Sequence, residues 1–380
     1  MNSLLKRMAL GLLIAVVPFL AGAQPEKTSA QPPKIQAAIL LDVSGSMQGL
    51  IEQAKAQLWN MMNVMGRVHS PQGTPRIEVA LYEYGRRTNR QDDGFSRRVS
   101  PFTTDLDSLS KLLFGLTIDG SDEHCAHTIY QSLNGLDWDT SAASYKVIFI
   151  AGNEDFMQGR IPYEQACAEA RKKGVIVNTI YCGPRNRGVD ERWDLGNQCG
   201  NGSYTYINHN LKMEDAPTPF DSVLLVLNDQ FNSTYIPYGR RGSKGHAQQA
   251  EVDKLNFGIS RKVAARRVMV KSQSKLYHNG DWDLVDAVQR DSSLLTRVER
   301  STLPDSLQKT SINQLRQVVM DKKVQRAQLR QEISTVQQQR EEFLEDERSK
   351  SSTLQQFATL ETEIEKIIQQ QVQRFRMFIR

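Results

Sequence analysis

The sequence is poor in features that mark a zinc protein or a hydrolase. Its four cysteines lack the C-x-x-C spacing that is typical of structural zinc sites. The chain contains no G-x-S-x-G nucleophile elbow, and none of its six histidines lies in a recognisable triad context. These absences argue against a structural zinc fold and against a serine hydrolase.

Strong net charge is also absent, as are long apolar runs after the N-terminus. A net charge of +5 over 380 residues is modest, and without a basic-aromatic surface pattern it is weak support for nucleic-acid binding. No segment after residue 23 is apolar enough to cross a bilayer. The composition, 39% hydrophobic and 24% charged, fits a soluble chain that is long enough for more than one domain.

The N-terminus has the pattern of a secretory signal. Lys6 and Arg7 precede an apolar run over residues 8–20, and the small residues 21–23 form a cleavage pattern. We therefore expect a signal peptide at 1–23, cleaved after Ala23, and a periplasmic or secreted protein. The alternative is an uncleaved anchor, for which the run is short. Residues 24–34 read as a flexible leader, and no cysteine follows the cleavage site to carry a lipid.

If the protein is exported, its cysteines are expected to form disulfides, because disulfides are the default in an oxidising compartment. The candidates for pairing are Cys125, Cys167, Cys182 and Cys199. Three connectivities are possible and the sequence does not choose among them. Free buried thiols remain the alternative.

Strand and helix patterns alternate from residue 35 to residue 210. Strands are predicted at 35–41, 76–84, 146–151, 175–181 and 203–207, with a short edge strand at 97–103. Helices are predicted at 50–65, 106–113, 125–133 and 163–173. Apolar strands alternating with helices predict an α/β fold with a doubly wound, mostly parallel sheet.

A turn rich in oxygen ligands follows the first predicted strand. In Asp42-Val43-Ser44-Gly45-Ser46, one carboxylate and two hydroxyls stand on alternate positions. Hard oxygen ligands suit Mg²⁺ or Mn²⁺, and ligands bind at the carboxyl ends of strands in α/β sheets. The alternative is a polar turn in which Ser46 caps the next helix.

The run Ala37-Ala38-Ile39-Leu40-Leu41-Asp42-Val43-Ser44-Gly45-Ser46-Met47 resembles the opening of a von Willebrand factor A domain. The resemblance covers residues 35–210. It implies a doubly wound fold with one divalent cation, Mg²⁺ or Mn²⁺, at a metal-ion-dependent adhesion site. It also implies that Ser44 and Ser46 bind the cation directly and that Asp42 acts through water, with Ser121 of Gly120-Ser121-Asp122 adding a hydroxyl from a second loop. Thr128 is the less favoured source of that hydroxyl.

The third loop departs from the family pattern. Gly152 stands where the resemblance implies an aspartate, and Glu154 or Asp155 would have to reach the metal or its waters instead. The alternative is a weaker site that depends more on its ligand. With less negative charge around it, the cation would attract an acidic ligand more strongly.

Strand patterns stop after residue 210. A helical region at 211–300 contains predicted helices at 220–231, 248–275 and 283–290, and a helical tail occupies 301–380. Apolar residues with heptad-like spacing predict a coiled coil that is weak or locally frayed, because Lys322, Arg326 and Arg340 interrupt the seam. A break near 349–353 precedes a second helix at 354–378. A folded-back helical pair and an intermolecular coiled coil explain these stripes equally well.

One further cluster, Asp122-Glu123-His124-Cys125-Ala126-His127, contains metal-ligand residue types, but neighbours this close rarely point to one zinc ion. The sequence as a whole predicts an exported, non-enzymatic module that binds an acidic group of a protein partner through its cation. The alternatives are a structural scaffold with a degenerate metal site that acts through its helical tail, and an accessory subunit of an enzyme.

Overall fold

The structure is a computed structural model that describes residues 32–120, 122–207, 218–350 and 360–379. The predicted signal peptide and most of the predicted leader lie outside these residues. None of the helices in the described ranges is long and apolar enough to span a membrane.

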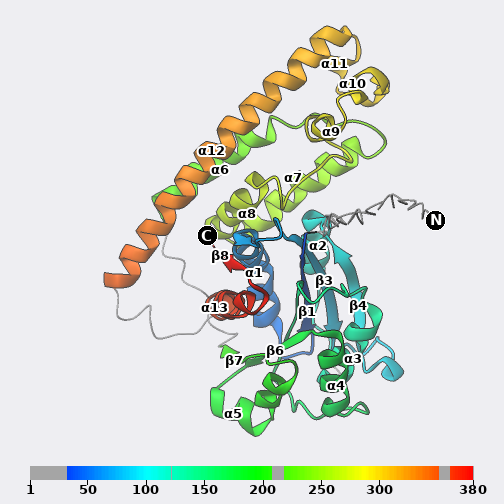
Figure 1. Ribbon diagram of the computed structural model, residues 1–380, viewed down its shortest axis with the longest axis vertical. Helices are drawn as coiled ribbons and strands as arrows, with labels where there is room; N and C mark the ends of the chain where they lie inside the picture. The colour runs from blue at the N-terminus through cyan, green and yellow to red at the C-terminus, as the bar shows by residue number, and fades with distance from the viewer. Residues whose placement is uncertain (1–31, 121, 208–217, 351–359, 380) are drawn as a thin grey trace, which may run out of the picture. The chain divides into compact units, whose positions relative to one another are not determined.

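A six-stranded sheet forms the centre of the α/β part, in the order β4-β3-β1-β5-β6-β7 (Figure 1). Its strands are β1 (Lys34–Asp42), β3 (Arg76–Tyr84), β4 (Arg97–Thr103), β5 (Tyr145–Gly152), β6 (Ile176–Cys182) and β7 (Tyr204–Ile207). The edge strand β4 is antiparallel to β3, and all other neighbours are parallel. The predicted, mostly parallel sheet is confirmed.

Helices cover both faces of this sheet, as a doubly wound fold requires. One face packs against α1 (Gln48–Gly66), α2 (Leu106–Phe114) and α13 (Leu360–Val372). The opposite face packs against α3 (Cys125–Gly135) and α4 (Tyr163–Lys173). The short helix α5 (Arg185–Asp190) precedes β7. The strands carry apolar residues into both layers, which explains why they read as near-continuous hydrophobic runs.

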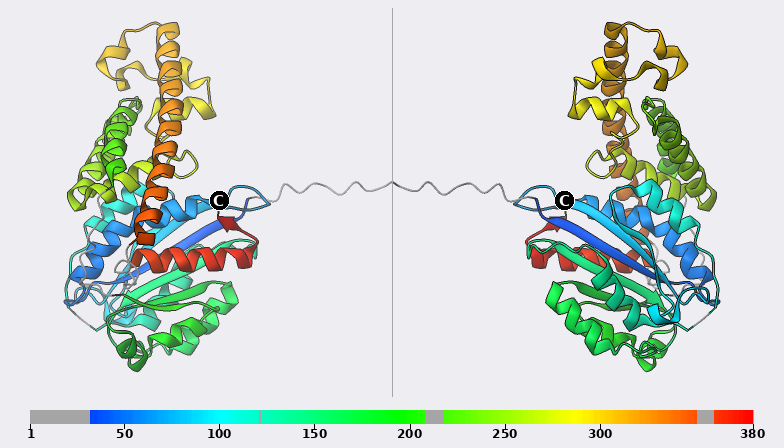
Figure 2. Two further views of the ribbon diagram at one scale, coloured as in Figure 1. Left: turned by 90° about the vertical axis from the view of Figure 1, so that its left-hand side faces the viewer. Right: turned by 90° about the vertical axis from the view of Figure 1, so that its right-hand side faces the viewer.

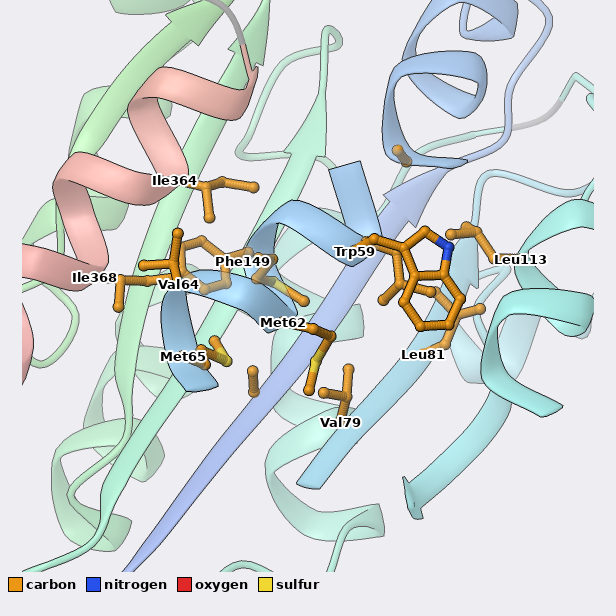
Figure 3. Close-up of a cluster of buried hydrophobic side chains, with 14 of the residues drawn as sticks. Trp59, Met62, Val64, Met65, Val79, Leu81, Leu113, Phe149, Ile364 and Ile368 are labelled. Carbon is orange, nitrogen blue, oxygen red and sulfur yellow. The ribbon is translucent and has the colours of Figure 1, made fainter. Parts of the chain in front are cut away.

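The last helix of the chain completes one of the two helical layers. In Figure 3, Ile364 and Ile368 of α13 lie beside Val64 of α1 and near Phe149 of β5. Figure 2 shows α13, in red, running beside the sheet. After it, the two-residue strand β8 (Phe378–Ile379) pairs with β2 (Val68–His69). The predicted boundary at residue 301 stays a prediction, but the C-terminal helix packs on the α/β part.

Polar contacts fix α13 at the sheet as well. The Tyr145 hydroxyl donates to Gln371 Oε1 at 2.9 Å, and Gln371 Nε2 donates to Asn178 Oδ1 at 2.7 Å. All three side chains are buried. A buried amide with satisfied partners specifies one placement of the helix more sharply than apolar packing does.

The segment between the sheet and the long C-terminal helix is helical, as predicted. Its helices are α6 (Pro219–Asn232), α7 (Gly242–Ile259), α8 (Arg261–Ser272), α9 (Leu284–Arg290), α10 (Leu294–Arg297) and α11 (Asp305–Gln308). The single helix predicted at 248–275 is wrong, because the chain is extended at Ser260. The hydroxyl of Ser260 caps α8 by accepting from Val263 N at 3.2 Å.

The long helix α12 (Ile312–Lys350) is continuous through its charged seam positions, so local fraying of the helix there is wrong, while a weak coiled coil stays a prediction. Arg326 is 1% exposed and pairs with Asp283 at 2.6 Å. Arg340 is also buried and pairs with Asp221 at 2.7 Å. These arginines face carboxylates of α6 and of the turn before α9, so α12 packs against helices of its own chain. An intermolecular coiled coil stays a prediction.

Candidate metal centre

The D-x-S-x-S turn leaves β1 in the middle of the sheet and leads into α1. Val43 N donates to Tyr84 O at 2.9 Å, which extends the pairing with β3 past the end of β1. Asp42 Oδ1 accepts from Ser44 N at 2.7 Å. These bonds fix the backbone of the turn and hold Asp42 against Ser44 at the carboxyl end of the strand.

Two oxygen atoms of this turn are buried without a hydrogen-bond partner in the described part of the chain. They are Asp42 Oδ2 and Ser44 Oγ, on side chains that are 0% and 4% exposed. Burying a carboxylate oxygen without a partner is costly. A divalent cation, which prefers oxygen ligands, would satisfy both atoms. The residues present therefore fit a divalent cation.

The electrostatics of the turn agree with this fit. Burial raises the pKa of the Asp42 carboxyl to about 7, although the hydrogen bond from Ser44 N lowers it. The negative charge of Glu154 adds to the rise. Negative charge is concentrated here, and a cation would offset it.

Ser46 lies at the exposed end of the turn, where its hydroxyl donates to Asn153 Oδ1 at 3.3 Å. The N-cap of α1 is Met47, and no side chain caps this helix. The alternative role of Ser46 as a helix cap is therefore wrong. Ser46 instead connects the turn to the loop after β5.

The second predicted ligand loop runs beside the turn. Asp119 N donates to Val43 O at 2.8 Å, and a Cβ added at Gly120 would lie 3.9 Å from Gly45 N. Ser121 itself lies outside the described residues, so its role as a ligand stays a prediction. Thr128, the less favoured candidate, is fully buried in α3 and donates to His124 O at 3.0 Å.

The third loop has no room for the aspartate that the resemblance implies at position 152. A Cβ added at Gly152 would overlap the hydroxyl oxygen of Tyr84 and would lie 3.1 Å from Asp42 Oδ2. Of the two proposed substitutes, Glu154 is close enough for its charge to raise the pKa of Asp42. Asp155 is exposed, and its Oδ1 accepts from Met157 N at 2.9 Å within its own turn.

Glu123 lies beside the turn, although the sequence assigned it no place in this site. A Cβ added at Gly85 would lie 3.1 Å from Glu123 Cγ, 3.0 Å from Asp42 Oδ1 and 3.5 Å from Ser44 Cβ. Glu123 is 8% exposed. Burial raises its pKa to about 8, and the charges of Asp42 and Glu154 add to the rise. The sequence signals were a carboxylate directly after the second ligand loop and its place among the metal-ligand residue types at 122–127.

The neighbouring residues do not form the alternative zinc site. The rings of His124 and His127 stack with centroids 6.5 Å apart. The thiol of Cys125 donates a hydrogen bond to the Tyr84 hydroxyl, with 3.8 Å between sulfur and oxygen. Throughout the described ranges, no three His, Cys, Asp or Glu side chains gather closely enough to hold a metal. Burial lowers the pKa of both histidines.

The cysteines form one disulfide, between Cys167 of α4 and Cys199. Cys125 and Cys182 are free and buried, which is the alternative of free buried thiols for these two positions. The reason is topological, because Cys125 lies in the core that packs against α3 and α4, while Cys182 lies in the core on the opposite face of the sheet.

Comparisons with known proteins concern the fold alone. No family model matches the sequence, and the comparison with curated proteins gives no match. The similar solved structures include an aerotolerance-related membrane protein from Bacteroides fragilis NCTC 9343, which is 15% identical over 46% of this chain and 93% of that chain, with a TM-score of 0.34. The SpRpn10 VWA domain is 14% identical over 46% of this chain and 88% of that chain, with a TM-score of 0.33.

A third similar structure is proximal thread matrix protein 1 from the mussel byssus, described with a zinc-occupied MIDAS motif. It is 12% identical over 46% of this chain and 42% of that chain, with a TM-score of 0.33. Identities and TM-scores this low carry no argument about function. The strand order and the D-x-S-x-S turn at the end of β1 carry the assignment, and by them residues 34–207 have a von Willebrand factor A-like fold.

Proposed function

We propose that this chain is a non-enzymatic binding module that holds a divalent cation at the end of β1 and uses it to bind an acidic group of a protein partner. Asp42, Ser44 and Ser46 are the ligands of the D-x-S-x-S turn, with Ser121 as a further hydroxyl. The observation that supports this proposal most strongly is the pair of buried, unpartnered oxygens, Asp42 Oδ2 and Ser44 Oγ. When bound, the cation would supply an open coordination position for a carboxylate oxygen of the partner.

A fixed guanidinium beside the turn supports an acidic partner. Arg87 is exposed, and its Nε donates to Gly120 O at 3.0 Å. Its Nη2 would lie 3.9 Å from a Cβ at Gly120, the same glycine that approaches Gly45. Within the described residues Arg87 has no ion-pair partner. A guanidinium next to a metal ion favours a carboxylate, which accepts paired hydrogen bonds from it.

The site is built to hold and orient rather than to transform. Asp42 accepts a backbone hydrogen bond through Oδ1 and leaves Oδ2 for the cation. Arg87 would place the partner's carboxylate through charge-assisted hydrogen bonds. The module acts in the periplasm or outside the cell after cleavage following Ala23, and N-terminal sequencing of the purified protein tests that step.

Thermal unfolding with and without cation tests the proposed function. A cation that binds the native state raises the melting temperature. At a hundredfold excess of cation over Kd, the free energy of unfolding increases by about 2.7 kcal/mol. We expect millimolar Mg²⁺ or Mn²⁺ to stabilise the wild type and the control Glu169→Gln, but not Asp42→Asn. Glu169 pairs with Lys172 and Lys173 on α4. Identical wild-type melting curves with and without both cations would contradict the proposal.

A structural scaffold is the second candidate, and one observation favours it. No carboxylate fits at position 152, because the Tyr84 hydroxyl fills that space, so the third loop offers none there. A scaffold would bind its partners through α12 and the helices around it, independently of any cation. Partner capture that is unchanged by chelation would favour this second function.

A further inference from the structure

The third loop of the metal centre offers no carboxylate where the family pattern has one. The hydroxyl of Tyr84 fills the space beside Gly152 and donates to Ala151 O at 2.8 Å. With Asp42 as the only carboxylate of the turn, a divalent cation would keep an uncompensated positive charge. The protein therefore needs a second carboxylate from another direction if the cation is to stay bound without a partner.

Glu123 comes from that other direction, the segment between the second ligand loop and α3. Glu123, Asp42 and Ser44 all lie around Gly85, within 3.0 to 3.5 Å of the position of its absent Cβ. Gly85 has a positive φ of 78°, which favours glycine, and any larger residue there would push between these side chains. The missing side chain at position 85 thus leaves Glu123 and the turn next to each other.

The carboxylate of Glu123 lies within reach of the Ser44 hydroxyl and of the Asp42 carboxyl group. It is largely buried, and in the described ranges it has no ion-pair partner. The two oxygens of the neighbouring turn that lack partners in the described ranges, Asp42 Oδ2 and Ser44 Oγ, belong to the two side chains that lie with Glu123 around Gly85. A buried carboxylate beside two unpartnered oxygens fits a cation between them better than it fits a solvated surface charge.

We propose that Glu123 is a ligand of the cation and replaces the carboxylate that position 152 cannot carry. This inference rests on the proposed function, because it names a further ligand of the same site. With Asp42 and Glu123 together, two carboxylates balance the two charges of Mg²⁺ or Mn²⁺. The cation is then held in the absence of a partner, contrary to the expectation that the missing aspartate makes the site weak or dependent on its ligand.

A titration of the full mature chain with Mn²⁺ tests this assignment. Calorimetry measures the affinity, and pulsed electron paramagnetic resonance measures the number of coordinated waters. We expect Glu123→Gln to weaken Mn²⁺ binding by about tenfold or more, because the number of charged ligands sets affinity in such sites. The resonance spectrum of bound Mn²⁺ should show one more coordinated water in this variant than in the wild type. Glu154→Gln should keep the wild-type water count, and Glu169→Gln should match the wild type in both measurements.

The outcomes separate the two proposals. A wild type that binds neither Mn²⁺ nor Mg²⁺ overturns the proposed function and this inference with it. A wild type that binds Mn²⁺, with unchanged affinity and water count in Glu123→Gln, overturns the inference alone. Equal losses in Glu123→Gln and Glu154→Gln without a change in water count also overturn it, since they would show only an effect of distant charge. If Glu123→Gln does not fold, Glu123→Asp keeps the charge but shortens the side chain, and the same water count decides.

Discussion

The hydroxyl of Tyr84 lies where the first side-chain atom of any residue other than glycine at position 152 would have to be. Tyr84 ends β3, Gly152 ends β5, and β1 with the D-x-S-x-S turn runs between them. The Tyr84 hydroxyl is fixed by a 2.8 Å hydrogen bond to Ala151 O, next to the glycine. The Tyr84 hydroxyl and a side chain at position 152 therefore exclude each other.

Gly152→Ala should destabilise the protein by about 1–3 kcal/mol, the usual cost of adding atoms to a filled core. Tyr84→Phe removes the overlapping oxygen, so the double variant should recover part of that loss. Urea unfolding of the wild type, both single variants and the double variant gives the coupling energy. Strictly additive effects of the two substitutions would contradict the overlap.

The same overlap changes how the effect of charge at this loop can be tested. Gly152→Asp alone adds a carboxylate and a clash together, so a change in cation affinity would have two causes. Tyr84→Ala with Gly152→Asp provides space for the carboxylate, and its control is Tyr84→Ala alone. We expect the aspartate to increase Mg²⁺ affinity only in the background that lacks the tyrosine ring. Equal increases in both backgrounds would show that Tyr84 does not control access to this position.

Most elements of the sheet follow from local sequence patterns. The strands at 76–84 and 97–103 and the helix at 163–173 have the predicted bounds, because their apolar periods and turn residues are short-range signals. The break at Ser260 was missed because the apolar pattern continues across it, while one extended residue ends α7 and its hydroxyl caps the start of α8. The sequence could indicate the apolar stripe of α13 but not that α1 is its partner, because that contact joins residues some 300 positions apart along the chain.

The candidate metal centre likewise combines residues that a local pattern predicts with residues that only the fold brings near. Asp42, Ser44 and Ser46 lie on one short turn, so their spacing alone predicted a shared site. A hydrogen bond joins Asp42 to Ser44, and the place of Ser46 among the ligands stays a prediction. Glu123 reaches the turn only because the segment before α3 passes Gly85, and no periodicity encodes that approach. The overlap of Tyr84 with position 152 could not be predicted from the sequence for the same reason, since the two residues lie two strands apart in the sheet.

Arg326 gives a prediction about the long helix. Its guanidinium binds Asp283 at 2.6 Å and Asp286 at 2.8 Å, and it donates to Thr234 O at 2.8 Å. Arg326→Met would leave Asp283 buried without its cation and Asp286 with only Arg330 at 4.0 Å, which costs about 3–5 kcal/mol. Urea unfolding measures this loss.

Two further variants make the test of Arg326 specific. Arg316→Met, at an exposed position of the same helix, should change stability by less than about 0.5 kcal/mol. Replacing Asp283 and Asp286 by Asn in the Arg326→Met background should recover stability, because the uncompensated charges are then gone. If Arg326→Met is as stable as Arg316→Met, the ion pairs do not hold α12 to the rest of the chain.

The disulfide predicts a definite thiol count. Without reductant, unfolded protein should react with a thiol reagent at two positions, Cys125 and Cys182, whereas native protein should react at neither because both are buried. Loss of the Cys167–Cys199 bridge, which spans 32 residues, should cost about 3–4 kcal/mol through the entropy of the unfolded chain. Four reactive thiols in the unreduced, unfolded protein would show that the bridge does not form.

The last prediction concerns acid stability and the ion cluster between α7, α8 and α2. Asp253 binds Arg267 Nε at 2.5 Å and Lys271 Nζ at 2.8 Å, and Arg267 also binds Asp107 at 2.6 Å. Burial alone would raise the pKa of Asp253, but the charges of Lys271 and Arg267 outweigh it and hold that pKa well below its usual range.

A carboxyl group whose pKa is lower in the folded state than in the unfolded state stabilises the fold above the unfolded value, about 3.9. That contribution is lost as the pH falls, because the unfolded chain takes up a proton before the folded chain does. The free energy of unfolding should therefore decrease between pH 5 and pH 3, by up to about 1.4 kcal/mol per pH unit from Asp253 alone. Asp253→Asn should be less stable at pH 6 and should show a shallower decrease, measured by urea unfolding at each pH. Asp190→Asn, at an exposed position, should keep the wild-type slope, and an unchanged slope in Asp253→Asn would exclude this cluster as the source of acid sensitivity.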